Sequence, residues 1–221
     1  MSLGDSLASL HGVIGALMSL LRVKTNAGPG QVVDVSLVES VFNVMESLVP
    51  EYAMFGHVRE RTGGSLPGIS PFNTYMAADG GFVVIAGNSD PIFRRLTAAV
   101  GRPDLAEGPD LQSNDGRVAR NMELDDAIAG WVGSLSTPQI LMALEAAEVP
   151  AGRIYSVADI VADPHFQARR MIVPMTLPDG TEVSRPGIIP WMSDTPGSVR
   201  SCGPTLGEHN EEVLRELGFP T

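Results

Sequence analysis

An aspartate near the amino terminus, Asp5, is the residue best suited to covalent chemistry. It stands between Gly4 and Ser6, at the start of a segment with apolar residues at helical spacing. A carboxylate in the first helical turn lies beside unpaired backbone N–H groups and the positive end of the helix dipole. This setting favours the ionised form that a carboxylate nucleophile or base requires. The structural alternative is an N-cap, with Asp5 accepting a hydrogen bond from the backbone of Leu7 or Ala8.

The other side chains with catalytic or metal-binding chemistry are scattered. His11 lies six residues after Asp5, which is about 600° of helical rotation, so it faces another direction and is expected in a core or an interface. Cys202 is the single cysteine, which excludes an intrachain disulfide, and its Pro/Gly/Ser-rich surroundings predict an inert thiol. The four histidines lack the spacing of a metal site, so no metal is expected.

The elements around Asp5 predict part of a parallel-sheet domain. A first helix is expected from about Asp5 to Lys24, stopped by the turn signals of residues 26–30. Residues 31–36 are rich in β-branched side chains and predict a strand. Residues 37–55 are apolar on several faces, which predicts a helix that is buried or lies at a subunit interface. One strand cannot form such a sheet, so the other strands must be supplied elsewhere.

The rest of the chain predicts a small α+β domain between a linker and a tail. Residues 57–71 are rich in Gly, Pro and Arg and predict a linker or loop. Asp79-Gly80 and Asp179-Gly180 predict the turns of two β-hairpins. We expect the two hairpins over residues 72–87 and 171–190. Three helices are expected between them, over residues 91–100, 118–135 and 136–148, followed by a short helix over residues 156–163. A final acidic helix is expected over residues 208–217.

Charge and hydropathy exclude several function classes. The formal net charge of the 221 residues is −11, without a basic cluster, which argues against a nucleic-acid partner. We find no apolar run as long as a membrane span and no signal peptide, so a cytoplasmic protein without membrane contact is expected.

The motifs, taken in order, resemble the class III CoA-transferase family, the group of carnitine-CoA-transferase, formyl-CoA-transferase and α-methylacyl-CoA racemase. The sequence pattern of this family is a G-D pair at the start of a long helix, a G-x-G-Q turn, and a V-D-V-x-L strand before a second helix. The matching segments are Gly4-Asp5-Ser6 with His11 and Ile14-Gly15, Gly28 to Leu37, Arg61 to Gly64, Asn73 to Tyr75, Asp79-Gly80, Val149 to Gly152, Ala162 to His165, and Leu206 to Leu214.

The resemblance implies a fold of the mixed class α/β plus α+β. Residues 1–56 would be the C-terminal part of a Rossmann-like large domain, and residues 57–71 a linker and active-site loop. Residues 72–190 would form the small α+β domain, and residues 191–221 a tail that returns to the large domain. The family's N-terminal half, which supplies most contacts to coenzyme A, has no counterpart in this sequence. The resemblance also implies interlocked subunits, so we expect a homodimer or an assembly with an N-terminal half.

The resemblance assigns Asp5 as the nucleophile of CoA transfer between an acyl-CoA and a carboxylic acid. An aspartyl-linked intermediate would conserve the thioester energy if water is excluded. Coenzyme A would be bound as substrate, with Leu37 in contact with it, and no permanently bound cofactor is expected. Two alternatives remain: an α-methylacyl-CoA racemase in which Asp5 is a base, and a non-catalytic fragment or subunit that needs an N-terminal partner half.

The glycine-rich loop that closes over the intermediate in formyl-CoA transferases maps by spacing to Leu66-Pro67-Gly68-Ile69-Ser70. This sequence retains only Gly68 from the family's run of glycines. Pro67 and Ile69 make the segment stiffer and more apolar. We therefore expect a larger acceptor, a dicarboxylic or branched acid, rather than formate or oxalate. The structural alternative is an ordinary interdomain linker.

Overall fold

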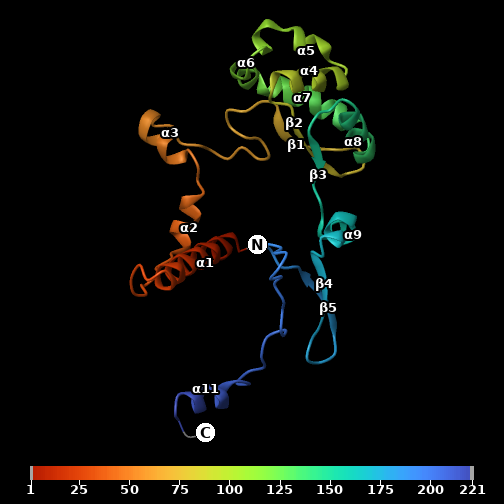
Figure 1. Cartoon of the computed structure of the whole chain (residues 1–221). Coiled ribbons are helices and arrows are strands. Elements are labelled where there is room, and N and C mark those ends of the chain that lie inside the picture. Colours follow the sequence, from red (N-terminus) through yellow and green to blue (C-terminus); the bar gives the residue numbers. More distant parts are fainter. Residues whose placement is uncertain (1, 220–221) are drawn as a thin grey trace. The chain divides into compact units, whose positions relative to one another are not determined.

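The computed structural model describes residues 2–219, which form two compact units (Figure 1). The boundary between the units lies between Gly63 and Gly64, inside the segment expected to be a linker. Helices and two small antiparallel sheets make up the chain, which agrees with the mixed class expected. The return of the tail to the large domain stays a prediction.

Unit 1 contains three helices: α1 (Leu3–Lys24), α2 (Leu37–Asn43) and α3 (Leu48–Phe55). Helix α1 begins two residues earlier than predicted, with Ser2 in the N-cap position. Asp5 is therefore the third residue of the helix, and the alternative in which it is the N-cap is wrong. The predicted end is confirmed, because Asn26 leaves the helix in a left-handed conformation with φ 56°.

Two predicted elements of unit 1 are wrong. Residues 31–36 are not a strand, since no segment within residues 2–63 pairs with them, and a strand exists only through hydrogen bonds to a neighbour. The predicted helix over residues 37–55 is broken after Asn43. Pro50 explains the break, because inside a continuous helix it would lack an N–H and its ring would clash with the carbonyl of Glu46. Glu46 instead takes a left-handed conformation, with φ 52°.

The apolar side chains of unit 1 are largely uncovered. The exposed large apolar side chains of α1, from Leu3 to Val23, are between 43% and 65% exposed. Val32, after the helix, is 93% exposed. An 18-residue window of α1 has a mean hydropathy of 1.5, so this helix is long and apolar enough to cross a membrane. Our expectation that no apolar run reaches the length of a membrane span was wrong, because Asp5, His11 and the serines are too few to lower the mean hydropathy of the helix.

Unit 2 begins with a three-stranded antiparallel sheet in the order β1 (Phe72–Met76), β2 (Phe82–Ala86) and β3 (Ala151–Arg153). The first predicted hairpin is confirmed, with Phe72 opposite Ala86 and Met76 opposite Phe82. Strand β3 escaped prediction because Ala-Gly-Arg has little intrinsic β propensity. Its pairing with β2 is a tertiary contact.

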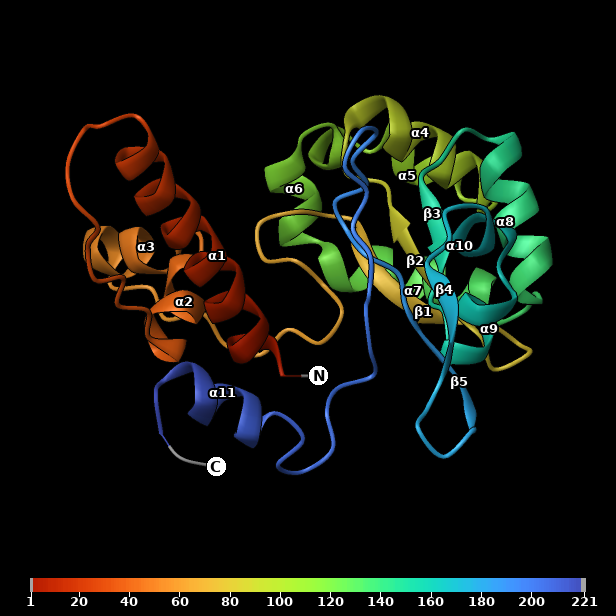
Figure 2. The ribbon, with the colours of Figure 1, turned by 60° about the horizontal axis from the view of Figure 1, so that its bottom comes forward.

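Helices pack around this sheet (Figure 2). They are α4 (Asp90–Ala99), α5 (Pro103–Glu107), the 3-10 turn η1 (Pro109–Leu111), α6 (Asn114–Ala119), α7 (Asn121–Val132) and α8 (Thr137–Ala146). The sheet contributes Tyr75, Val83 and Ile85 to the core, where they pack with residues such as Leu96 and Leu144. The helix predicted over residues 118–135 corresponds to α7, which begins after a break at Arg120. Helices α5 and α6 and the turn η1 were not predicted.

The remaining elements of unit 2 are α9 (Val157–Ala162), α10 (Pro164–Ala168), β4 (Ile172–Thr176), β5 (Glu182–Pro186) and α11 (Asn210–Glu216). Helices α8 and α9 begin where they were expected, each at a capping box, Ser136 with Gln139 and Ser156 with Asp159. Strands β4 and β5 confirm the second hairpin. Helix α10 was not predicted; its N-cap is Asp163, which accepts bonds from the backbone of the first turn.

The first testable prediction concerns two helical glycines of unit 2. A Cβ on Gly116 in α6 would lie 1.6 Å from the carbonyl oxygen of Asp110, whereas one on Gly130 in α7 would meet nothing within 4 Å. We expect Gly116→Ala to lower the free energy of unfolding by about 3 kcal/mol, because backbone must move. Gly130→Ala, the matched control, should raise it by about 0.5 kcal/mol. Urea unfolding measures both, and equal effects would contradict the packing.

Candidate active site

Asp5 lies exposed in the first turn of the 22-residue helix α1. Its backbone oxygen accepts a hydrogen bond from Ser9 Oγ at 2.8 Å. Ser2, in the N-cap position, makes no side-chain cap bond. The backbone N–H groups of the first turn therefore receive no hydrogen bond from the Ser2 side chain. The Asp5 carboxyl group lies at this end of the helix, where the helix dipole is positive. An exposed carboxyl side chain in this place is accessible to an acyl group.

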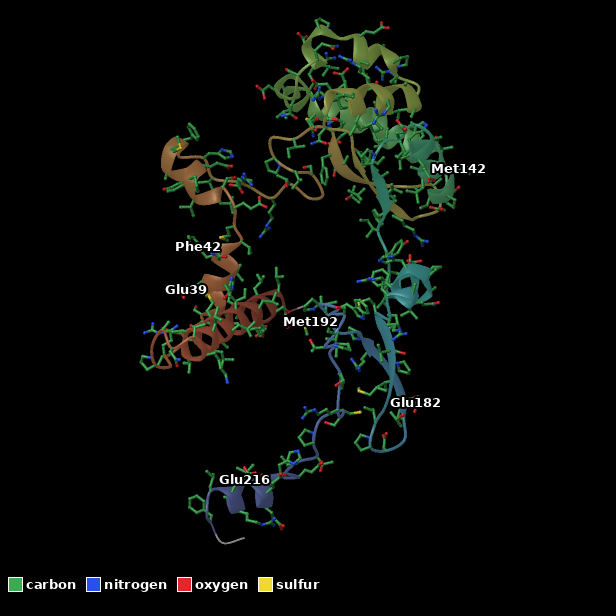
Figure 3. All side chains as sticks on the ribbon, in the orientation of Figure 1. Glu39, Phe42, Met142, Glu182, Met192 and Glu216 are labelled. Carbon is green, nitrogen blue, oxygen red and sulfur yellow. The ribbon has the colours of Figure 1, made fainter. Side chains whose placement is uncertain are left out.

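A shallow apolar hollow of about 360 Å³ in unit 1 is lined by Gly4, the residue before Asp5, but not by Asp5 itself. Gly4 forms one wall, and a Cβ there would lie 3.6 Å from Val41 Cγ2. The other lining residues are apolar and come from α2 and the residues after it: Leu37, Val38, Val41, Phe42 and Met45. Figure 3 shows Phe42 and Glu39 on α2. The fold thus brings Leu37, the expected contact to coenzyme A, to the hollow beside the neighbour of Asp5.

His11 lines a different hollow, of about 380 Å³, together with Val33, Glu39 and Asn43. Its Nδ1 atom is buried without a hydrogen-bond partner among the described residues. A Cβ on Gly15 would lie 2.6 Å from Val33 Cγ1, so Gly15 allows the 31–36 segment to pack closely on α1. His11 and Gly15 therefore pack α1 against its neighbours, and the hollow beside Gly4 does not include them.

The predicted active-site loop forms a tight turn in unit 2. Ile69 N donates to Leu66 O at 3.3 Å, which closes a four-residue turn. Pro67 and Gly68 are the two central residues, and Gly68 has φ +77°. Proline followed by a residue with positive φ is the pattern of a type II turn, in which glycine avoids strain. The turn supports the expectation that Pro67 stiffens this segment.

Ser70 anchors the C-terminal end of this turn. It is only 1% exposed, and each of its polar groups is bonded to a side chain from α6 or α7. Its N–H donates to Asn114 Oδ1 at 3.2 Å, and its hydroxyl donates to Asn121 Oδ1 at 2.6 Å. Its carbonyl accepts from Arg117 Nε at 3.1 Å. Asn114 also donates to Gly68 O at 2.8 Å, so one amide holds both ends of the segment 68–70.

Arg117 is itself buried, with 1% of its surface exposed. Its guanidinium donates to the carbonyls of Leu111 and Asn88 and to Asp90 Oδ1 at 2.8 Å, besides Ser70. The guanidinium carbon also lies 5.0 Å from the centre of the Phe93 ring. A buried cation needs such complete bonding, because an unpaired one is very costly.

Asp125 extends the network from the turn to the sheet. Its Oδ2 accepts from Asn121 at 2.8 Å and from Asn73 at 3.1 Å, and its Oδ1 accepts from the Tyr75 hydroxyl at 2.5 Å. Burial, and then the hydrogen bond to Asp125, raise the pKa of Tyr75 well above its usual range. The anion is thus held by neutral donors from α7 and β1.

The sequence analysis did not select the side chains that hold the turn: Asn114, Arg117, Asn121 and Asp125. Their spacing of three, four and four residues marks one face of a helix. This polar stripe at helical spacing was the available signal. Ser70, the common partner of Asn114, Arg117 and Asn121, lies more than 40 residues away in sequence, which no local pattern could indicate.

Comparisons with known proteins assign the family. Residues 1–210 match the family described as CoA-transferase family III. Over 216 residues the chain is 43% identical to succinyl-CoA–D-citramalate CoA-transferase of Chloroflexus aurantiacus, covering 98% of this chain and 54% of that relative. It is 38% identical to the beta subunit of succinyl-CoA–L-malate CoA-transferase of the same organism, covering 98% of this chain and 54% of that one.

A solved structure supports the same assignment. The crystal structure of a CAIB/BAIF family protein from Brucella suis superimposes with a TM-score of 0.75 and 30% identity, over 97% of this chain and 55% of that one. The chain belongs to CoA-transferase family III. It spans about half the length of the curated relatives it matches.

The second prediction tests the Tyr75–Asp125 contact by pH. Because the folded chain keeps the Tyr75 proton at a pH where the unfolded chain releases it, the unfolded state binds fewer protons, and stability falls as pH rises above about 10. Tyr75→Phe should remove this dependence, while costing about 1–2 kcal/mol at neutral pH through the lost bond. Urea unfolding between pH 8 and pH 11 measures both effects. A variant as pH-sensitive as wild type would contradict the assignment.

Proposed function

We propose that this chain carries the nucleophile of a CoA-transferase that moves coenzyme A from an acyl-CoA to a carboxylic acid. The observation that supports it most is Asp5, exposed in the first turn of a long helix, in a chain of CoA-transferase family III. The transferase is favoured over the racemase alternative because the relatives described above are named as CoA-transferases.

The reaction proceeds through covalent steps at Asp5. Its carboxylate attacks the thioester carbonyl carbon, the C–S bond breaks, and a mixed anhydride forms as coenzyme A leaves as the thiolate. The thiolate attacks the aspartyl carbonyl of the anhydride, which releases the donor acid and leaves an aspartyl-CoA thioester. The acceptor carboxylate then attacks this thioester, and the thiolate returns to the acceptor acyl carbon, which frees Asp5.

A dicarboxylic acid is the best candidate for the acceptor, with succinyl-CoA as donor. The two relatives described above are named for succinyl-CoA and for citramalate or malate. Pro67 and Ile69 make the turn over residues 66–70 stiffer and more apolar than a run of glycines. We infer that this turn, Leu66-Pro67-Gly68-Ile69-Ser70, acts as the active-site loop of the transferase.

The exposed apolar surface of unit 1 supports the proposal that another protein segment or subunit covers it. The exposed large apolar side chains of α1, α2 and α3 form an extensive surface, and such surfaces mark protein interfaces. We infer that unit 1 is the last part of a Rossmann-like large domain, covered by an N-terminal half and by a second copy in a homodimer. The assembly would work in the cytoplasm with coenzyme A bound as substrate.

The third prediction tests the nucleophile. Asp5→Asn should lower succinyl-CoA:dicarboxylate transfer at least about 10³-fold, because the amide cannot form the anhydride. Hydroxylamine added to wild type with succinyl-CoA should convert Asp5 to the hydroxamate, which peptide mass analysis detects. The assay uses the chain alone and with an N-terminal half supplied from a relative.

The matched control for this test is Asp126→Asn, since Asp126 is exposed on α7 of unit 2. This variant should keep wild-type transfer. Full activity of Asp5→Asn, or a hydroxamate elsewhere, would refute the proposal. Exchange of the α-proton of a methyl-branched acyl-CoA with solvent, without acyl transfer, would assign the racemase function instead.

The fourth prediction tests the apolar surface. Leu17→Glu places a charge on the exposed face of α1, where Leu17 is 60% exposed. It should abolish dimer formation, or binding of the N-terminal half, without unfolding the chain. The matched control is Met142→Glu on α8, where Met142 is 66% exposed (Figure 3), and it should leave assembly unchanged. Sedimentation velocity measures both, and a stable, well-folded wild-type monomer would contradict the assembly.

A further inference from the structure

We propose that a hollow beside the open end of the β4–β5 hairpin binds a small oxyanion with two negative charges, a phosphate group or a dicarboxylate. The hollow has a volume of about 200 Å³ and lies within unit 2. Three arginines, Arg169, Arg170 and Arg185, line it together with Trp191. Binding there does not require the proposed transferase activity, because Asp5 belongs to unit 1.

The pairing of the hairpin strands brings these arginines together. Val173 is paired with Arg185, so both side chains lie on the same face of the hairpin, and both line the hollow. Gly187 N donates to Met171 O at 3.0 Å, and a Cβ on Gly187 would overlap Arg170 O. This close approach holds Arg170 against the strand that carries Arg185. The basic cluster is therefore a product of the fold, and the sequence alone does not show it.

The three arginines carry charge that no carboxylate neutralises, since none of the ion pairs within residues 2–219 includes them. Other arginines of unit 2 are paired with carboxylates, namely Arg102, Arg117, Arg120 and Arg153. Like charges that gather at one place repel one another, and a bound anion offsets this repulsion. In a chain with a net charge of −11, three unpaired cations at one hollow indicate an anionic ligand.

The guanidinium of Arg185 also has a donor that the protein leaves unsatisfied. Its Nη1 donates to Pro186 O at 3.0 Å, whereas its Nε is buried without a hydrogen-bond partner among residues 2–219. Buried polar groups are almost always bonded, and an exception calls for an explanation such as a bound ion or a function. Phosphate and carboxylate oxygens are the acceptors that fit the fork of a guanidinium group. An oxyanion in the hollow therefore supplies the acceptor that Arg185 lacks.

Arg170 occupies a backbone position that favours glycine. It follows α10 with φ 53°, and the next residue, Met171, donates its N–H to Phe166 O at 2.8 Å. A residue in this left-handed conformation after a helix is usually glycine, because a side chain there adds strain. Arginine at this position costs strain and supplies a cation to the hollow, which is explained if the charge has a function.

The size and charge of the hollow limit the ligand. A volume of about 200 Å³ is below the range of about 300–1,000 Å³ typical of sites for drug-sized molecules. Coenzyme A is too large for it, whereas inorganic phosphate and a four-carbon dicarboxylate are small. Two negative charges offset most of the charge of three arginines. The shared chemistry of the ligand is thus a compact dianion with oxygen acceptors.

The experiment measures binding of inorganic phosphate and, separately, of succinate to the full chain by titration calorimetry. The buffer is free of phosphate, and chloride keeps the ionic strength constant. We expect a Kd of about 1 mM or below for at least one of the two anions. Arg185→Gln removes the proposed fork and should weaken binding at least about tenfold.

Arg170→Gly separates binding from folding. This variant should weaken binding at least about fivefold through the lost charge. It should keep the thermal stability of wild type, because glycine takes the positive φ without strain. The matched control is Arg215→Gln, which removes an exposed arginine of α11 that does not line the hollow. Its binding should equal that of wild type.

A second readout is hydrogen exchange over residues 196–198, which line the hollow on the side of the tail. A bound anion connects this segment to the hairpin, so exchange there should slow about threefold or more when the binding anion is added. The same addition should leave exchange in Arg185→Gln unchanged. Thermal unfolding of each variant checks that its fold is kept.

The outcomes either support or overturn the proposal. Binding that weakens in Arg185→Gln and Arg170→Gly but not in Arg215→Gln supports it, and the anion that binds more tightly identifies the ligand as phosphate or dicarboxylate. Absence of binding of both anions at about 10 mM overturns it, as does binding that the two variants leave unchanged. Loss of binding when an N-terminal half from a relative is added also overturns it, because protein would then cover the arginines.

Discussion

The guanidinium of Arg117 joins four separate segments of unit 2. From its own helix α6, which is one of the four, its donors reach the end of the 66–70 turn at Ser70, the start of α4 at Asn88 and Asp90, and the 3-10 turn at Leu111. A buried cation is tolerated only when its bonds are satisfied, and removal of partners typically costs several kcal/mol. Each segment is therefore fixed relative to the others by the same group, and the proposed active-site turn inherits this rigidity.

Whereas the buried Arg117 network of unit 2 is satisfied, the apolar side chains of unit 1 are not covered. Helices α1 to α3 present large apolar side chains that nothing within the unit covers, although the hydrophobic effect strongly favours their burial. The proposed nucleophile and the expected contact to coenzyme A, Asp5 and Leu37, both lie on this incomplete unit. The proposed acyl transfer at Asp5 must exclude water, so we expect another protein segment or subunit to enclose this part of unit 1.

The two units contribute different properties to the proposed reaction. Unit 1 supplies the reactive carboxylate and the apolar hollow beside Gly4. Unit 2 supplies a stiff turn, with Pro67 and Gly68 at its centre and a polar network behind it. A nucleophile that conserves thioester energy as an anhydride is useful only where hydrolysis of the anhydride is slow.

The sequence by itself determined the features that depend on near neighbours. The hairpin turns at Asp79-Gly80 and Asp179-Gly180, and the capping box of Ser136, follow from contacts within a few residues. The break in the helix predicted over residues 37–55 also has a local cause, Pro50, which our sequence analysis did not use. The family was readable from motifs in order along the chain.

Only the tertiary structure decided which distant groups meet. Residues 31–36 have the composition of a strand, yet strand formation requires a partner that residues 2–63 do not provide. Asn114, Arg117 and Asn121 share one helical face in the sequence, but their convergence on Ser70 depends on how the helices pack against the start of β1. Periodicity predicts which face a side chain occupies, whereas its partner is fixed only when the chain closes over tens of residues.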